Sequence, residues 1–179
     1  MLAAECAWTI LQADHAKMRR LLDAIAREAG DGPWRVAGPT PARLKEFIDT
    51  LRTFDHVSHR PKGTALLGVL RGRSPDADRL LADMELEREE DDALLDQALA
   101  RLDAFTRGEK DAATECTALL AQHRNRVLLH MDQEDTLLRA QSEQLLDHEE
   151  WAHVVSLIST SLYPTANADR LGTAPEKRR

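Results

Sequence analysis

Apolar residues recur every three or four positions over long stretches of this chain. One such series is Trp8, Leu11, His15, Met18, Leu22, Ile25 and Ala29. A period near 3.6 residues places such a series on one face of an α-helix. Leu and Ala dominate the composition and aromatic residues make up only 4%, so strong helix formers outnumber the residues favoured in strands. The sequence therefore predicts an all-α fold.

Glycine and proline clusters divide the 179 residues into helical segments. The breaks at 30–33, 71–75 and 108 predict helices over 9–29, 41–71, 75–106 and 111–140. Thr9 with Gln12 and Asp147 with Glu150 resemble N-terminal caps, and the second pair opens a short helix that ends before Pro164. Pro61 removes a backbone donor and predicts a kink near His59. Four long helices with short connections predict an antiparallel four-helix bundle with a short fifth C-terminal helix.

Domain organisation follows from the same pattern. Residues 1–162 are expected to form one domain, whereas 163–179 carry no periodic apolar residues and are expected to be a disordered tail. No apolar run approaches the roughly 20 residues of a membrane span, and the first residues lack a basic secretory region. The expected location is therefore the cytoplasm, with no membrane association.

Charge and cysteine content exclude several classes of protein. The net charge is −7, which gives no basic surface for nucleic acid or anionic lipid. Cys6 and Cys116 are too few for a disulfide framework, and we interpret both as reduced, packed thiols. The chain has no nucleophile and base motif, no phosphate-binding loop and no nucleotide fingerprint. Nothing in the sequence requires enzymatic turnover.

Ionisable residues interrupt the apolar series near the middle of each predicted helix. Burying such a group costs several kcal/mol unless it is paired or bound to a metal, so similar interruptions in four helices suggest a common cause. His130 and Glu134 are one helical turn apart and can direct two ligands to one centre. The interrupting residues are His15 in the first helix, Asp55 and His59 in the second, Arg88 with Asp91 or Asp92 in the third, and His123, His130 and Glu134 in the fourth.

A single histidine in an apolar series is more often a hydrogen-bonded core residue than a metal ligand. His15, His59, His130 and Glu134 together favour a metal pocket of imidazole and carboxylate ligands, which suit iron, manganese or zinc. Four further side chains are candidates to support or replace a ligand: Asp55, His56, Arg88 and His123. His148 and His153 are interpreted as surface residues. The acidic run 85–92 is interpreted as a solvated helix face from which only Arg88 and one aspartate turn inward.

These residues resemble a known family, the hemerythrin-like or HHE cation-binding four-helix bundles, from about Leu11 to Ile158. The family presents a His-x-x-x-Glu ligand pair before an apolar run, which His130-Met131-Asp132-Gln133-Glu134 matches. His15 matches the position of its first-helix ligand. The family's His-His-Pro-Lys-Glu corresponds to His59-Arg60-Pro61-Lys62-Gly63, and its Met-Glu-x-Glu-His to Met84-Glu85-Leu86-Glu87-Arg88.

The resemblance implies a diiron site from which two ligands are missing. Gly63 stands where the family has glutamate, and Arg88 stands where it has a ligand histidine. Arg88 brings a permanent positive charge that repels a nearby cation and can pair with Glu134. Asp55 can replace the lost carboxylate only if it points inward.

Two principal hypotheses follow for function. In the first, the protein holds non-haem iron, one ion rather than two, with His15, His59, His130 and Glu134 as ligands. The resemblance then implies dioxygen or nitric oxide binding, redox sensing or iron handling. In the second, the bundle holds no metal, an Arg88–Glu134 pair closes the pocket, and the protein is an interaction or regulatory module. A redox enzyme, such as an oxidase or an iron–sulfur repair factor, is a third hypothesis that the missing ligands disfavour. A protein partner or a homodimer is compatible with each of them.

Overall fold

The computed structural model describes residues 2–30, 34 and 38–162, and these form helices without any strand. Two of the long helical rods each contain a five-residue π-helical segment. The segment between α2 and α3 is named η1, and the one between α5 and α6 is named η2. The elements in chain order are α1 (Leu2–Ala29), α2 (Thr40–Phe54), η1 (Asp55–His59), α3 (Arg60–Leu70), α4 (Pro75–Thr106), α5 (Ala112–Gln133), η2 (Glu134–Leu138), α6 (Arg139–Leu145) and α7 (His148–Leu162).

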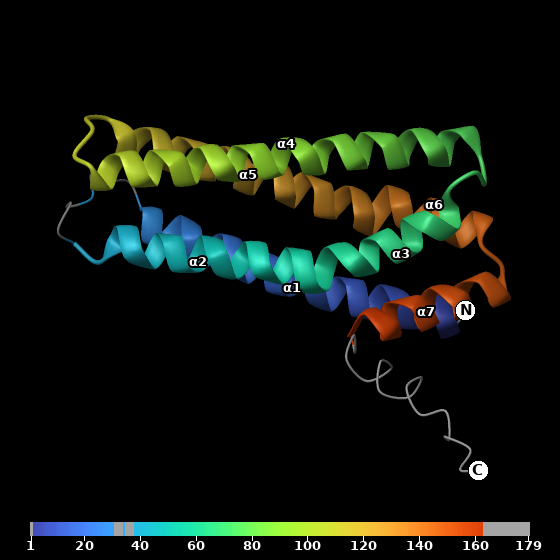
Figure 1. Cartoon of the computed structure of the whole chain (residues 1–179). Helices are drawn as coiled ribbons and strands as arrows, with labels where there is room; N and C mark the ends of the chain where they lie inside the picture. The colour runs from blue at the N-terminus through green and yellow to red at the C-terminus, as the bar shows by residue number, and fades with distance from the viewer. Residues whose placement is uncertain (1, 31–33, 35–37, 163–179) are drawn as a thin grey trace, which may run out of the picture.

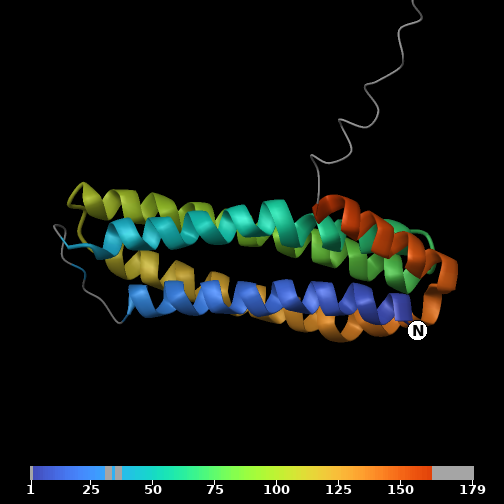
Figure 2. The same cartoon turned by 90° about the horizontal axis from the view of Figure 1, so that it is seen from below.

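Four antiparallel rods make up the bundle (Figure 1). α1 packs on α2 and α5, and α4 packs on the same two helices from the opposite corner. The view from below shows the same long, narrow arrangement (Figure 2). The predicted all-α fold with a short C-terminal helix is confirmed.

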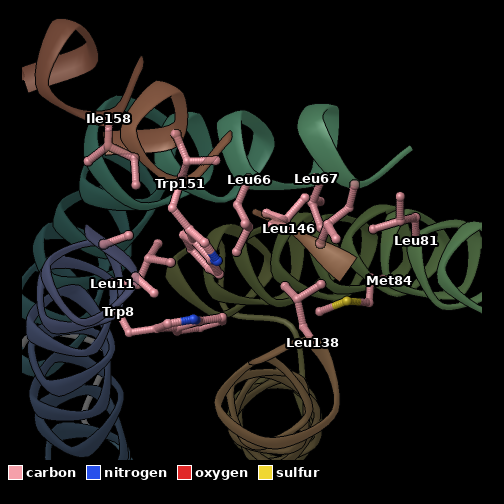
Figure 3. Packing of buried hydrophobic residues seen from close by; sticks show 14 residues of the cluster. Trp8, Leu11, Leu66, Leu67, Leu81, Met84, Leu138, Leu146, Trp151 and Ile158 are labelled. Atoms are coloured by element: carbon pink, nitrogen blue, oxygen red, sulfur yellow. The ribbon is translucent and has the colours of Figure 1, made fainter. Parts of the chain in front are cut away.

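Helix α7 folds back over one end of the bundle, where it contacts α1 and α3. Its buried residues Trp151, Val154 and Ile158 join a cluster that includes Trp8 and Leu138 (Figure 3). This contact explains why α1 begins at Leu2 rather than at Thr9 as the sequence suggested. Burial of apolar side chains in the first two turns stabilises helix there.

Several predicted boundaries agree with the structure. Gly30 and Gly108 adopt positive φ angles of 53° and 86° just after α1 and α4 end, a conformation that glycine adopts without a steric penalty. Ser74 caps α4 by accepting a hydrogen bond from the Ala77 amide. Asp147 and Glu150 cap α7 reciprocally, as expected, through two side-chain to backbone hydrogen bonds of 2.9 Å.

Other local predictions were wrong. Thr9 does not cap a helix, because it lies inside α1 and its hydroxyl donates to the Glu5 carbonyl. Cys6 is exposed rather than packed, whereas Cys116 is buried as expected. The rod that begins with α5 continues to Leu145 instead of ending near residue 140. The predicted tail, 163–179, lies outside the described residues.

The π-helical segment η1 ends two residues before Pro61, where the sequence predicts a kink. In η1 a backbone amide bonds to the carbonyl five residues earlier instead of four. The Arg60 amide, for example, donates to the Asp55 carbonyl. This shift accommodates Pro61 in the first turn of α3, because proline has no amide to donate and its ring crowds the preceding turn. π-helical segments insert one extra residue into a helix and occur often at functional sites.

A polar layer separates the apolar core into two clusters. One cluster lies at the α7 end and the other extends from Met18 to Ala29 on α1 and across the facing parts of α2, α4 and α5. Buried polar residues such as His15, His59 and Glu134 come between these clusters along the chain. Within the described ranges, none of the helices is long and apolar enough to span a membrane.

One buried ion pair in this layer joins α1 to α3. The Lys62 ammonium donates to Asp14 at 2.5 Å and to Ser58 at 2.9 Å, and Lys62 is only 2% exposed. Ser58 also donates to Asp14 at 3.2 Å. Because a buried charge is costly without its partner, the pair holds these two helices in one register.

Replacing Lys62 should test that role. We expect Lys62→Met to lower the free energy of unfolding by about 3 kcal/mol, because it leaves the Asp14 carboxylate buried without its cation. The double variant Lys62→Met/Asp14→Leu should recover most of this loss, since no charge then remains. Urea unfolding followed by circular dichroism measures both. An equal loss of unfolding free energy in the single and double variants would contradict the role assigned to the Lys62–Asp14 ion pair.

Candidate metal centre

The carboxylate of Glu134 is the centre of the polar layer. It is 2% exposed and is supplied by η2. Its Oε2 atom lies 2.8 Å from Nε2 of His15 and 3.4 Å from Nε2 of His59. Its Oε1 atom lies 2.8 Å from the Arg88 guanidinium and 3.2 Å from Nε2 of His130. Each oxygen of this one carboxylate thus faces its own pair of partners.

The four predicted ligands therefore meet at one place, but not equally closely. One ligand atom each from His15, His59 and Glu134 lies within 4.8 Å of the others, and all three residues are buried. His130 lies on the opposite side of the carboxylate, beside Oε1. The structure thus separates a compact group of three residues from a second side that contains His130 and Arg88.

Each of the three histidines contacts a second carboxylate through its other ring nitrogen. Nδ1 of His15 lies 2.9 Å from Asp135, and Nδ1 of His130 lies 3.0 Å from Glu87. Nδ1 of His59 lies 2.9 Å from Asp55. A carboxylate that accepts from Nδ1 fixes the orientation of each ring and turns its Nε2 atom toward Glu134.

Two of the central nitrogens are left without a hydrogen bond. Among the described residues, Nε2 of His59 and Nε2 of His130 are buried and have no hydrogen-bond partner. Their short distances to Glu134 are close enough for electrostatic attraction, but the geometry is not that of a hydrogen bond. Buried polar atoms are nearly always satisfied, so two orphaned nitrogens at one centre point to a missing partner.

Charge at the centre shifts several pKa values. Burial lowers the pKa of His59, but the Asp55 and Glu134 carboxylates outweigh burial and raise this pKa to about 9. Burial raises the pKa of Glu134, yet His130, His15 and His59 hold it well below its usual range. Burial raises the pKa of Asp55, but His59 and Arg60 outweigh burial and lower this pKa to about 2. Without a metal, the centre is an imidazolium–carboxylate network.

Arg88 occupies the second side of the carboxylate, and the expected Arg88–Glu134 ion pair forms at 2.8 Å. Gly63 provides the space for it. A Cβ atom at position 63 would lie 2.9 Å from the terminal nitrogen Nη2 of Arg88 and 3.8 Å from Oε1 of Glu134. A side chain at this position would require the Nη2 end of Arg88 to shift.

The remaining candidates have other surroundings. Asp55 does not face the centre, because its carboxylate binds Nδ1 of His59 and the Arg60 guanidinium. It therefore does not replace the carboxylate lost at Gly63. His56 is exposed and belongs to no part of the cluster. His123 is buried, and desolvation lowers its pKa to about 4, so its imidazole is neutral.

Two residues that contact the ligands were missed by the sequence analysis. Asp135 follows Glu134 directly, and Glu87 belongs to the acidic run that was interpreted as a solvated face. That interpretation was wrong for Glu87, which reaches His130. The π-helical turn at Glu134–Leu138 helps both Glu134 and Asp135 reach His15. Two sequence features could have indicated these residues. Asp135 is adjacent to a predicted ligand, and Glu87 is a carboxylate on the helix that faces His130.

The donor set could hold a cation. His15, His59 and Glu134 offer two imidazole nitrogens and one carboxylate oxygen, a combination common for iron and zinc. Two cations need further carboxylates to balance their charge, but the second side of Glu134 already holds the positive charge of Arg88. The residues present therefore agree with a single-ion centre.

Comparison with known families agrees with this chemistry. Residues 6–141, more than half of the chain, match the sequence model of the family described as the Hemerythrin HHE cation binding domain. No curated protein and no solved structure matches the chain.

The raised pKa of His59 predicts how stability depends on pH in protein treated with a chelator. A folded-state pKa of about 9 lies above the unfolded value of 6.5, so the stabilisation is complete below pH 6.5 and is lost as pH rises through 9. We expect the free energy of unfolding to fall by on the order of 2–4 kcal/mol across this interval. Urea unfolding between pH 6 and 10 measures it. His59→Gln should show a smaller decline, because only His130, whose pKa is also raised, against burial, by Glu134, still titrates at the centre. An equally steep decline in that variant would show that His59 is not the source of the pH dependence.

The contact between Gly63 and Arg88 can be tested with a matched glycine in the same helix. Gly68 has no atom within 4 Å of the position a Cβ would take, so Gly68→Ala should stabilise α3 by about 0.5–1 kcal/mol. Gly63→Ala should stabilise the protein less than Gly68→Ala does, because the new methyl group requires Nη2 of Arg88 to shift beside Glu134. Urea unfolding of the two variants gives the comparison. Equal stabilisation by both would show that the space at Gly63 is not needed.

Proposed function

Because the chain belongs to the hemerythrin HHE cation-binding domain family, we propose that it binds a single transition-metal ion at His15, His59 and Glu134. Iron is the metal expected from the family and is compatible with the donors. The proposed ion lies on the Oε2 side of Glu134, where the three ligand atoms are within 4.8 Å of one another.

The arrangement around the histidines is the observation that carries this proposal. Three buried imidazoles from three rods each have a carboxylate at Nδ1, and their Nε2 atoms surround one carboxylate. Metal-binding histidines are almost always held by an acceptor at their other nitrogen, which fixes the tautomer and the ring orientation. An isolated core histidine needs only one such partner, so the threefold repetition favours a shared ligand.

The residues of the centre would each have a distinct task. His15 and His59 would donate through Nε2, while Asp135 and Asp55 hold the rings in place through Nδ1. His59 must release the proton that its pKa of about 9 retains near neutral pH, so metal binding would release protons to solvent. A bound iron ion would supply Lewis acidity, a redox couple and open coordination positions, which suit dioxygen or nitric oxide binding, redox sensing or iron handling.

A small cavity beside the centre supports a small ligand. Its volume is about 50 Å³, and Met18, Leu95, Asp91, His59 and His130 are among its lining residues. A water molecule needs at least roughly 10–15 Å³ of such volume, so the space suits a few water-sized or diatomic molecules. A larger organic substrate would not fit without rearrangement of the helices.

One observation favours a second function, that of a metal-free interaction or regulatory module. Arg88 and His15 already contact Glu134 at 2.8 Å each, so the buried carboxylate is paired without any ion. In this alternative the polar layer fixes the register of the bundle and the surface carries the function. The cytoplasmic location and a protein partner or second copy of the chain remain predictions under both functions.

Metal analysis of matched histidine variants tests the proposal. We expect protein purified without chelator or nickel resin, then loaded anaerobically with Fe(II), to retain one ion per chain by mass spectrometry. His59→Gln should reduce retention at least tenfold, because it removes a ligand. His56→Gln is the control, since this exposed histidine lies in the same π-helical segment, and it should retain the full ion.

Each alternative result has a defined meaning. No retained iron after loading would contradict the proposal and favour the metal-free module. Two ions per chain would show that the second side of Glu134 accepts a metal despite Arg88. Equal loss in His56→Gln and His59→Gln would place the bound ion elsewhere on the protein.

A further inference from the structure

The two oxygens of Glu134 have unequal surroundings, which makes this carboxylate two-sided. On the Oε2 side are two histidine rings, His15 at 2.8 Å and His59 at 3.4 Å, whose protons can be displaced by a metal ion. On the Oε1 side are one imidazole, His130, and the permanent cation of Arg88. A carboxylate can bridge two cations, one at each oxygen.

We propose that the Arg88 guanidinium is a tethered substitute for a second metal ion, and that it limits this centre to one ion. This inference rests on the proposed single-ion function. Arg88 sits at hydrogen-bonding distance from Oε1, a contact that a second ion bridged by Glu134 would need. Its charge is permanent, so no change of pH within the physiological range vacates the position.

The unused nitrogen of His130 supports the assignment. Nε2 of His130 is buried without a hydrogen bond and faces the same oxygen as Arg88. Its Nδ1 is held by Glu87, the arrangement seen at His15 and His59. His130 is thus oriented as a ligand on the side that Arg88 occupies.

Gly63 and Arg88 act as an interlocked pair. The missing side chain at position 63 leaves space that Nη2 of Arg88 occupies, since a Cβ there would lie 2.9 Å from this nitrogen. The same position is 3.8 Å from Oε1 of Glu134, so a longer carboxylate side chain at residue 63 would reach the second side once Arg88 is shortened. Changing both residues together should therefore convert the tethered charge into an ion-binding position.

Counting metal ions in a double variant tests the proposal. Wild type, Arg88→His/Gly63→Glu and the control Arg126→His are loaded anaerobically with Fe(II), desalted and analysed by mass spectrometry. Arg126 is a suitable control because, like Arg88, it forms an ion pair between α4 and the α5 rod. Its partners are Glu90 and Asp91 instead of Glu134. We expect one ion per chain in wild type and in the control, and two in the double variant.

The results separate this inference from the proposed function. One ion in wild type and one in the double variant would overturn the role of Arg88 and leave the single-ion function intact. No ion in wild type but at least one in the double variant would overturn the function while supporting the role of Arg88. No ion in either protein would overturn both.

A milder substitution covers the case in which the double variant does not fold. Arg88→Gln keeps Gly63 and removes only the positive charge beside Glu134. If the guanidinium occupies a cation position, its loss should lower the dissociation constant for Fe(II) at least tenfold, because two nearby positive charges no longer repel. Arg126→Gln should change it less than twofold. Unchanged affinity in Arg88→Gln would overturn the proposal.

Discussion

A single buried carboxylate, that of Glu134, determines how the rest of this bundle is arranged. An ionised carboxylate removed from water is stable only when donors or cations surround it. Here each of the four rods supplies one or more: His15 from α1, His59 from η1, Arg88 from α4 and His130 from α5. The helices can therefore slide or rotate only as far as these contacts allow, so the centre helps to fix their mutual register.

The π-helical segments explain how a regular bundle can bring so many polar groups to one level. In an α-helix, consecutive residues point 100° apart and only one of them faces the core. The segments Asp55–His59 and Glu134–Leu138 each add a residue to the local turn. Each segment also combines a central group with a residue that supports a histidine, Asp55 beside His59 and Asp135 beside Glu134. These segments thereby bring the carboxylate and its histidine partners to one level of the bundle.

Periodic spacing was enough to predict the bundle, because apolar series of this length have few other ways to be buried. It also predicted His15, His59, His130 and Glu134 as inward-facing, since each interrupts such a series. Spacing could not reveal Glu87 or Asp135, whose contacts with the histidines depend on helix rotation and on the π-helical turn. Nor could it reveal the contact between Gly63 and Arg88, which depends on the distance between two helices. The early start of α1 was missed because its stabilising partner, α7, is distant in sequence.

The polar layer also divides the protein mechanically. The apolar cluster beneath α7 and the cluster toward the opposite end are separate groups of buried residues. Between them the rods are joined by charged contacts such as Lys62–Asp14 and Arg88–Glu134. The two halves are therefore joined by the continuous helices and by a seam of charged contacts at mid-length. A change of charge in this seam would be felt by both apolar clusters at once, although the seam belongs to neither.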